Sequence, residues 1–165
     1  MNLTPGKLND DQLRKAFVHN LNRMYFGKRY LDQKMSALIE TASFKALKLA
    51  LTEMHGDVKN QISRMAEMYT LINEQPTDEN ENPIKTIVKD DFCLNTSGDM
   101  PVLNDMDILL YVQILEHINI TAYRLMKMTA PILNNKEVEQ LLTECFDESV
   151  DDDQLFVLIT KEYIS

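Results

Sequence analysis

The segment Leu49–Val58, with the sequence LALTEMHGDV, carries Glu53 and His55 inside a long helical pattern. A glutamate and a histidine three residues apart project from the same side of a helix, and such Glu-x-x-His pairs bind di-iron centres in four-helix bundles. Here Thr52 occupies the position three residues before His55 and is a poor metal ligand. Glu53 is two residues away, about 200° around the helix, so it points elsewhere. The segment therefore resembles half of a dinuclear metal site that has lost its first carboxylate.

Length and composition predict one all-α domain spanning residues 1–165. Gly and Pro are scarce, Trp is absent and helix-favouring residues are abundant. A net charge of −9 argues against nucleic acid, whose phosphates require Lys and Arg. No apolar run approaches the ~20 residues of a membrane-spanning helix, and the first residues do not resemble a signal peptide. Two cysteines, Cys93 and Cys145, do not form a disulfide framework, so we expect a cytoplasmic protein.

Hydrophobic residues recur at spacings of three and four in four segments, which predict helices over about 10–39, 44–75, 105–130 and 135–162. Asn9 and Gln12 are suitably spaced for a capping box at the start of the first helix. Pro131 is expected to interrupt or end the third. The segment of about 76–104 contains three prolines and clustered Asp and Asn, which predict a long connection. Two helical hairpins joined by one long crossover are the connectivity of a ferritin-like four-helix bundle.

Polar residues interrupt each hydrophobic stripe near its middle, and antiparallel packing would bring the four interruptions to one level of the bundle. These residues are Lys28 in the first helix, Thr52 and His55 in the second, Glu116 and Asn119 in the third, and Glu148, Ser149 and Asp152 in the fourth. A buried charge is costly unless it is paired, so four coincident interruptions indicate a site. Ordinary explanations exist for each: the lysine can extend to water, the histidine can be structural, and the acidic run can be a solvated face.

Three segments resemble the bacterial ferritin-like stress-protein family typified by YciE and YciF. They are FVHNLNRMYFGKRYL at residues 17–31, EMHGDVKNQI at 53–62 and QILEHINITAY at 113–123. The resemblance covers most of the chain outside the crossover. It implies a ferritin-like four-helix bundle, usually dimeric, with a dinuclear metal site and an association with stress responses.

The metal ligands that the resemblance implies are only partly present in this sequence. The family's glutamate in the first helix falls on Lys28, and the glutamate of its Glu-x-x-His motif falls on Thr52. In the third helix the family has the motif Glu-His-x-Glu. This sequence keeps its first glutamate as Glu116 and has Asn119 in place of the last. A dinuclear site needs roughly four carboxylates and two histidines, and a protonated lysine cannot coordinate a metal. We therefore expect no bound metal and no other cofactor.

If a metal is bound, the remaining ligands are His55, Glu116, Glu148 and Asp152. A sharper hypothesis is that Lys28 replaces the lost metal, with its ammonium paired to Glu116 or to the carboxylates of the last helix. The sequence thus predicts a non-catalytic bundle protein, without catalytic residues, that forms a homodimer and has a stress-related role. An iron-binding protein or an oxidase-type enzyme that uses the reduced site is the alternative. Redox sensing by Cys93 is a third hypothesis, which the neighbouring Asp90 and Asp91 disfavour because they oppose thiolate formation.

Overall fold

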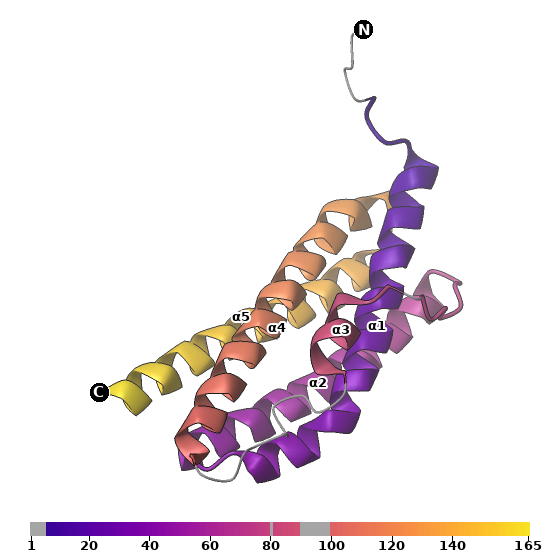
Figure 1. Cartoon of the computed structure of the whole chain (residues 1–165). Helices are drawn as coiled ribbons and strands as arrows, with labels where there is room; N and C mark the ends of the chain where they lie inside the picture. The colour runs from indigo at the N-terminus through magenta and orange to yellow at the C-terminus, as the bar shows by residue number, and fades with distance from the viewer. Residues whose placement is uncertain (1–5, 80, 90–99) are drawn as a thin grey trace, which may run out of the picture.

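The computed structural model describes residues 6–79, 81–89 and 100–165. Four long helices account for most of these residues (Figure 1). The helical elements are α1 (Asp10–Thr41), α2 (Lys45–Leu71), α3 (Pro83–Val88), α4 (Pro101–Thr129), the 3₁₀ helix η1 (Ala130–Leu133) and α5 (Lys136–Ile164). The described ranges contain no β-strand, so the prediction of an all-α fold is confirmed.

The four long helices form two antiparallel hairpins. A three-residue connection joins α1 to α2, and η1 joins α4 to α5. The hairpins pack against each other through contacts of α1 with α4 and of α2 with α5 (Figure 1). This arrangement is the predicted four-helix bundle with one long crossover. No helix in the described part of the chain is both long enough and apolar enough to cross a membrane.

The structure confirms two of the predicted helix boundaries. Asn9 and Gln12 form the reciprocal capping box, in which each side chain accepts a hydrogen bond from the backbone N–H of the other residue. Pro131 lies inside η1, immediately after α4 ends at Thr129. The missing N–H of proline removes an interior helical hydrogen bond, which explains why the α-helix does not continue.

Other predicted boundaries were wrong by a few residues. The second helix ends at Leu71 rather than near 75, because Asn73 adopts a positive φ of 54° and turns the chain before the proline. The third helix begins at Pro101 rather than near 105. Proline is well suited to a first helical position because it lacks the N–H that would be unsatisfied there.

The crossover contains a short helix that the sequence pattern did not predict. The Asn82 side chain accepts hydrogen bonds from the backbone N–H groups of Ile84 and Lys85, which begins α3. The same side chain donates to the carbonyl of Arg23 over 2.8 Å and so holds α3 on α1. At this contact Gly27 is required, because a Cβ there would lie 2.8 Å from Ile84 Cβ and 2.9 Å from Asn82 Oδ1.

One end of the bundle is held by a buried carboxylate. Asp105 of α4 accepts hydrogen bonds from the backbone N–H groups of Ser43 and Phe44, from the Ser43 hydroxyl and from the Tyr163 hydroxyl. These contacts join the α1–α2 connection to α4 and α5. Asp105 also accepts from the backbone N–H of Phe44, the N-cap residue of α2, whose own side chain makes no capping bond.

Candidate functional site

Polar residues from three helices lie in the core of the bundle, between large apolar side chains. Lys28 of α1, Glu116 and Asn119 of α4, and Ser149 and Asp152 of α5 are all at most 3% exposed. Lys28, Asn119, Ser149 and Asp152 all interact with Glu116, so these positions of α1, α4 and α5 lie at a similar level of the bundle. We call these five residues the central polar cluster.

Lys28 is completely buried, and its ammonium makes no hydrogen bond. Its Nζ lies 6.0 Å from the centroid of the Tyr123 ring. Among the described residues, no carboxylate oxygen lies within 4.0 Å of this nitrogen, since every ion pair at that range involves other side chains. The predicted ion pair of Lys28 with Glu116 or with the carboxylates of the last helix is therefore not made, although the charge of Lys28 still acts on Glu116.

The buried carboxyl groups near Lys28 favour their protonated forms. Burial raises the pKa of Glu116, and the positive charge of Lys28 partly offsets this effect. Burial also raises the pKa of Asp152 to about 8, with the charges of Glu116 and Asp57 acting in the same direction. Asn119 Nδ2 donates to Glu116 Oε2 over 3.0 Å. The main cause of both shifts is desolvation, which disfavours the ionised carboxylate.

The second helix contributes to the site differently from the sequence prediction. His55 Nε2 lies 2.7 Å from Asp32 Oδ1 of α1, which makes it an interhelical contact outside the central polar cluster. Thr52 is exposed, and its hydroxyl donates to the carbonyl of Lys48. The prediction that these two residues interrupt the core was therefore wrong. The buried polar residue of α2 is Gln61, which is 1% exposed.

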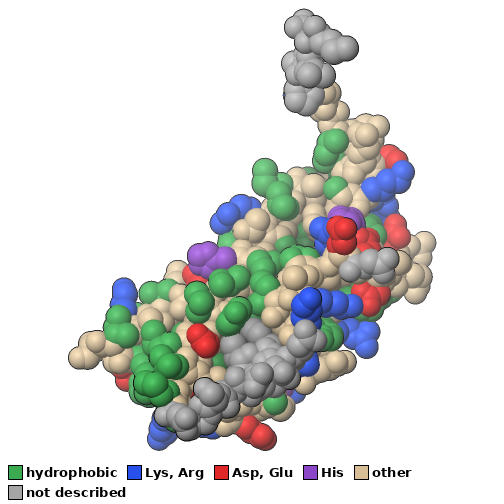
Figure 2. Space-filling view, in the orientation of Figure 1, with side chains coloured by type: hydrophobic (Ala, Val, Ile, Leu, Met, Phe, Trp, Pro, Cys, Tyr) green, Lys and Arg blue, Asp and Glu red, His purple; other side chains and the backbone are tan. Residues whose placement is uncertain are grey.

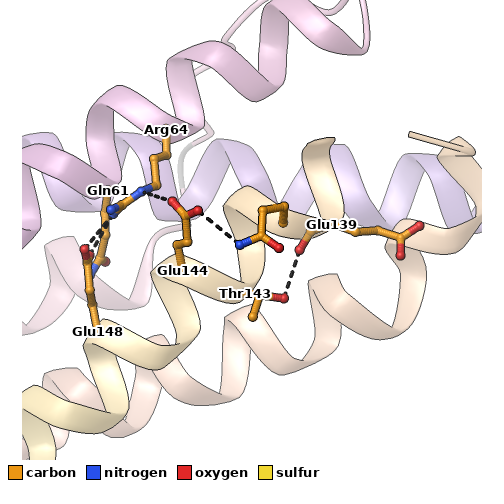
Figure 3. A network of polar contacts seen from close by, with 7 residues as sticks. Gln61, Arg64, Glu139, Thr143, Glu144 and Glu148 are labelled. Atoms are coloured by element: carbon orange, nitrogen blue, oxygen red, sulfur yellow. Dashed lines mark hydrogen bonds and ion pairs between the residues drawn. The ribbon is translucent and has the colours of Figure 1, made fainter. Parts of the chain in front are cut away.

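Gln61 joins the core to a network between α2 and α5. Its Oε1 accepts a hydrogen bond from the Tyr123 hydroxyl over 2.8 Å, and its Nε2 donates to Glu148 over 3.1 Å. Arg64, one turn later, points from α2 toward α5 and binds both Glu144 and Glu148 (Figure 3). Glu148 is thus already engaged by two side chains of α2.

Cys145 lies on α5 one turn before Ser149 and is fully buried. Burial raises the pKa of its thiol to about 12, so it remains protonated at neutral pH. Cys93, the thiol considered for redox sensing, lies outside the described residues.

The donor set does not fit a dinuclear metal centre. In the part of the chain that the structure describes, no three His, Cys, Asp or Glu side chains converge to hold a metal ion. Of the four remaining ligands predicted from the sequence, His55 contacts Asp32 and Glu148 contacts Arg64, while Glu116 and Asp152 are buried beside the charge of Lys28. That no metal is bound stays a prediction for solution measurements.

A protein-family model for a domain of unknown function, DUF892, matches residues 12–164. The chain belongs to the DUF892 family. Because the match covers almost the whole sequence, the bundle and its crossover are both part of the family domain. No curated protein sequence matches this chain significantly.

Two solved structures of similar proteins have the same fold as this DUF892 protein. The stress protein YciF of Escherichia coli is 17% identical, with a TM-score of 0.84 over 92% of this chain and 96% of YciF. YcfI of Rhodopseudomonas palustris, for which a structural role has been suggested, is 19% identical, with a TM-score of 0.78 over 93% of this chain and 96% of YcfI. At these identities the similarity establishes the fold, and the resemblance to the YciE/YciF family is confirmed.

Proposed function

We propose that this protein is a non-catalytic ferritin-like bundle that has lost the dinuclear metal centre of its family, with the charge of Lys28 in place of the metal. The observation that carries the proposal is the complete burial of Lys28 among carboxyl groups. Its positive charge acts on Glu116, Asp152 and Asp57. A metal cation at the same level would be repelled by this ammonium, and it would have to compete for carboxyl groups that favour protonation.

The biological role that we propose is structural and stress-related. The names of the two similar proteins support this choice, since one is called a stress protein and a structural role has been suggested for the other. A cytoplasmic location belongs to the same proposal and rests on the small number of cysteines.

Metal content tests the proposal directly. The purified protein is analysed by mass spectrometry before and after anaerobic loading with Fe(II) and desalting, and we expect almost no bound metal in either sample. About one tightly held metal ion per chain that is lost in His55→Ala would overturn the proposal. That result would instead support an iron-binding protein or an oxidase-type enzyme that uses His55, Glu116, Glu148 and Asp152.

A variant that restores the carboxylates provides the matched control. Lys28→Glu combined with Asn119→Glu removes the buried ammonium and adds two potential ligands at the positions where the family has glutamate. We expect this double variant to bind more metal than the wild type after the same loading. Lys28→Met, which removes the charge without adding ligands, separates the effect of the charge from the effect of the new carboxylates.

We also propose a homodimer formed through the outer face of α4. Of the large hydrophobic side chains exposed in the described ranges, seven lie on this helix, and hydrophobic side chains gather over it (Figure 2). They are Val102, Leu103, Leu110, Tyr111, Ile114, Leu125 and Met128. Part of this surface is a groove of about 620 Å³ between α4, Asn20 of α1 and Pro83 of α3. Concentration of exposed apolar area on one helix favours an interaction surface.

The spacing of the groove residues favours a second copy of the chain as the partner. Leu110 and Leu125 lie symmetrically about the point between His117 and Ile118, as do Ile114 and Thr121. Two α4 helices that cross antiparallel at this point would place Leu110 of one copy against Leu125 of the other. Such an isologous contact uses the same surface twice, which is the commonest symmetry of soluble dimers.

Light scattering after size-exclusion chromatography tests the dimer. We expect a dimeric wild type and a monomeric Ile114→Glu variant, because the new charge would be buried without a partner in the interface. Leu158→Glu is the control, since Leu158 is an exposed apolar residue on α5 outside the groove. A monomeric wild type, or an Ile114→Glu variant that stays dimeric, would refute this interface.

A further inference from the structure

Four polar atoms of the central polar cluster lack hydrogen-bond partners. They are Lys28 Nζ, Glu116 Oε1, Asn119 Oδ1 and Ser149 Oγ. The residues that carry them are at most 1% exposed, so bulk water does not satisfy these atoms. An unsatisfied buried polar group costs about 1–3 kcal/mol, and native proteins contain few of them. Four such atoms in one part of the core therefore require a physical explanation.

The four atoms are chemically complementary. The Lys28 ammonium offers three N–H donors, Glu116 Oε1 and Asn119 Oδ1 offer lone pairs, and the Ser149 hydroxyl can both donate and accept. Asn119 and Ser149 lie beside the Glu116 carboxyl, and the charge of Lys28 acts on the same carboxyl group. Polar groups of α1, α4 and α5 thus surround the Glu116 carboxyl. Apart from the bond from Asn119 Nδ2 to Glu116 Oε2, these four atoms remain without a hydrogen bond within 3.5 Å.

A water molecule can bridge polar groups that lie beyond direct hydrogen-bond range. Lys28 Nζ lies more than 4.0 Å from the carboxylate oxygens, since no ion pair forms at that range. Two hydrogen bonds through one water molecule join heavy atoms that are roughly 4.5–5.5 Å apart. Buried water molecules typically make about three hydrogen bonds to groups that would otherwise be unsatisfied.

We propose that the central polar cluster is an internal water-binding site, in which ordered water connects the Lys28 ammonium with Glu116, Asn119 and Ser149. The interaction between the buried lysine and the buried carboxyl group then passes through water rather than through a direct ion pair. The inference rests on the proposed function in one respect, because it requires that no metal occupies this level of the bundle.

Acidic side chains offer a route by which this water exchanges with the solvent. Asp152 interacts electrostatically with the buried Glu116 and with Asp57 and Glu53 of α2. Asp57 is half-buried and Glu53 is exposed, so polar groups extend from the surface to the core. Hydrated polar groups of this kind provide a path that an entirely apolar core would not.

A crystal structure of the wild-type protein tests the proposal, together with ¹⁷O magnetic relaxation dispersion to count long-lived internal water in solution. We expect density for at least one water oxygen about 2.7–3.2 Å from Lys28 Nζ and from one or more of the three acceptors. A direct contact between Lys28 and Glu116 without water would overturn the proposal. Density about 2.0–2.6 Å from the side-chain oxygens would indicate a metal and would refute the proposed function as well.

Two variants and a control make the assignment specific. Ser149→Ala removes one partner with little change in volume, and we expect it to weaken or displace the bound water. Lys28→Met should remove the long-lived water from the relaxation profile. Cys145→Ala lies one turn earlier on the same face of α5 and removes no partner of the site, so it should leave the water in place. An unchanged count of internal water in both Ser149→Ala and Lys28→Met would contradict the site.

Discussion

Gly27→Ala tests how α3 is held on the bundle, and the two helical glycines make a matched pair. A Cβ at Gly27 would lie 2.8 Å from Ile84 Cβ, 2.9 Å from Ile84 Cδ1 and 2.9 Å from Asn82 Oδ1. By contrast, a Cβ at Gly56 of α2 would have no atom within 4 Å. The two substitutions therefore make the same change in helix propensity and differ in what the new methyl group meets.

The expected free energies follow from these contacts. Replacing glycine by alanine inside a helix contributes about 1 kcal/mol of stability, which is the full effect expected for Gly56→Ala. Overpacking a close contact costs about 1–3 kcal/mol. At Gly27 the cost should lie in the upper part of that range, because the Cβ of Ile84 is fixed by its backbone and cannot rotate away. We expect Gly27→Ala to lower the free energy of unfolding by roughly 1–2 kcal/mol.

Urea unfolding followed by circular dichroism measures both variants, and hydrogen exchange shows where the change occurs. In Gly27→Ala the backbone amides of residues 83–88 should exchange faster, because displacement of α3 breaks the bond from Asn82 to the Arg23 carbonyl. In Gly56→Ala this exchange should be unchanged. If Gly27→Ala raises the free energy of unfolding as much as Gly56→Ala does, the conclusion that α3 packs closely on α1 at Gly27 is refuted.

Three further predictions concern buried groups. Asp105→Ala should destabilise the protein by on the order of 3 kcal/mol in urea unfolding, because Ser43 and Tyr163 lose a shared charged acceptor. Burial raises the pKa of Asp152 from its ordinary value of 3.8 to about 8, so the folded protein binds more protons than the unfolded chain between these pH values. The stability that protonated Asp152 contributes is complete below about pH 4 and is lost as the pH rises through 8. Asp152→Asn should therefore reduce the fall in the free energy of unfolding that denaturant experiments measure between about pH 5 and 8. The buried Cys145 thiol, with its pKa near 12, should resist iodoacetamide in the native protein at neutral pH and react after unfolding, as peptide mapping would show.

The long helices could be predicted because their hydrophobic residues repeat with the helical period. The capping box at Asn9 and the interruption at Pro131 are local signals, and both appear in the structure. The six-residue α3 could not be predicted in this way, because it is too short to show a period. Its only signal is Asn82 followed by proline, a combination that also occurs in turns.

The buried site was predictable only in part, and its two errors have different causes. Lys28 and Glu116 interrupt strong apolar stripes, so the sequence indicated their burial, which the structure confirms. The position of His55 depends on Asp32 of another helix, and periodicity within one helix does not reveal such a partner. Gln61 was missed because a single glutamine in a helix is common and usually lies on the surface.

A double-mutant cycle would measure whether Lys28 and Glu116 stabilise each other. Their charges interact in the core without direct contact, so the net effect is the balance between the cost of desolvating both groups and their attraction. If the ammonium stabilises the ionised form of Glu116, Lys28→Met should destabilise the protein by less than the ~3–5 kcal/mol of a broken direct ion pair, because the two groups are not in contact. Adding Glu116→Gln should then recover part of this loss, since the uncompensated charge is removed.

The wild type, Lys28→Met, Glu116→Gln and the double variant are compared by urea unfolding at neutral pH. The coupling energy is the difference between the change in unfolding free energy of the double variant and the sum of the changes in the two single variants. Cys145→Ala serves as a control for cavity formation, because it truncates a buried side chain of α5 without changing the charge. A Lys28→Met variant as stable as the wild type, or more stable, would refute the idea that this lysine compensates the buried acids. Its desolvation cost would then exceed its electrostatic benefit, and stability would not explain why a lysine occupies the core.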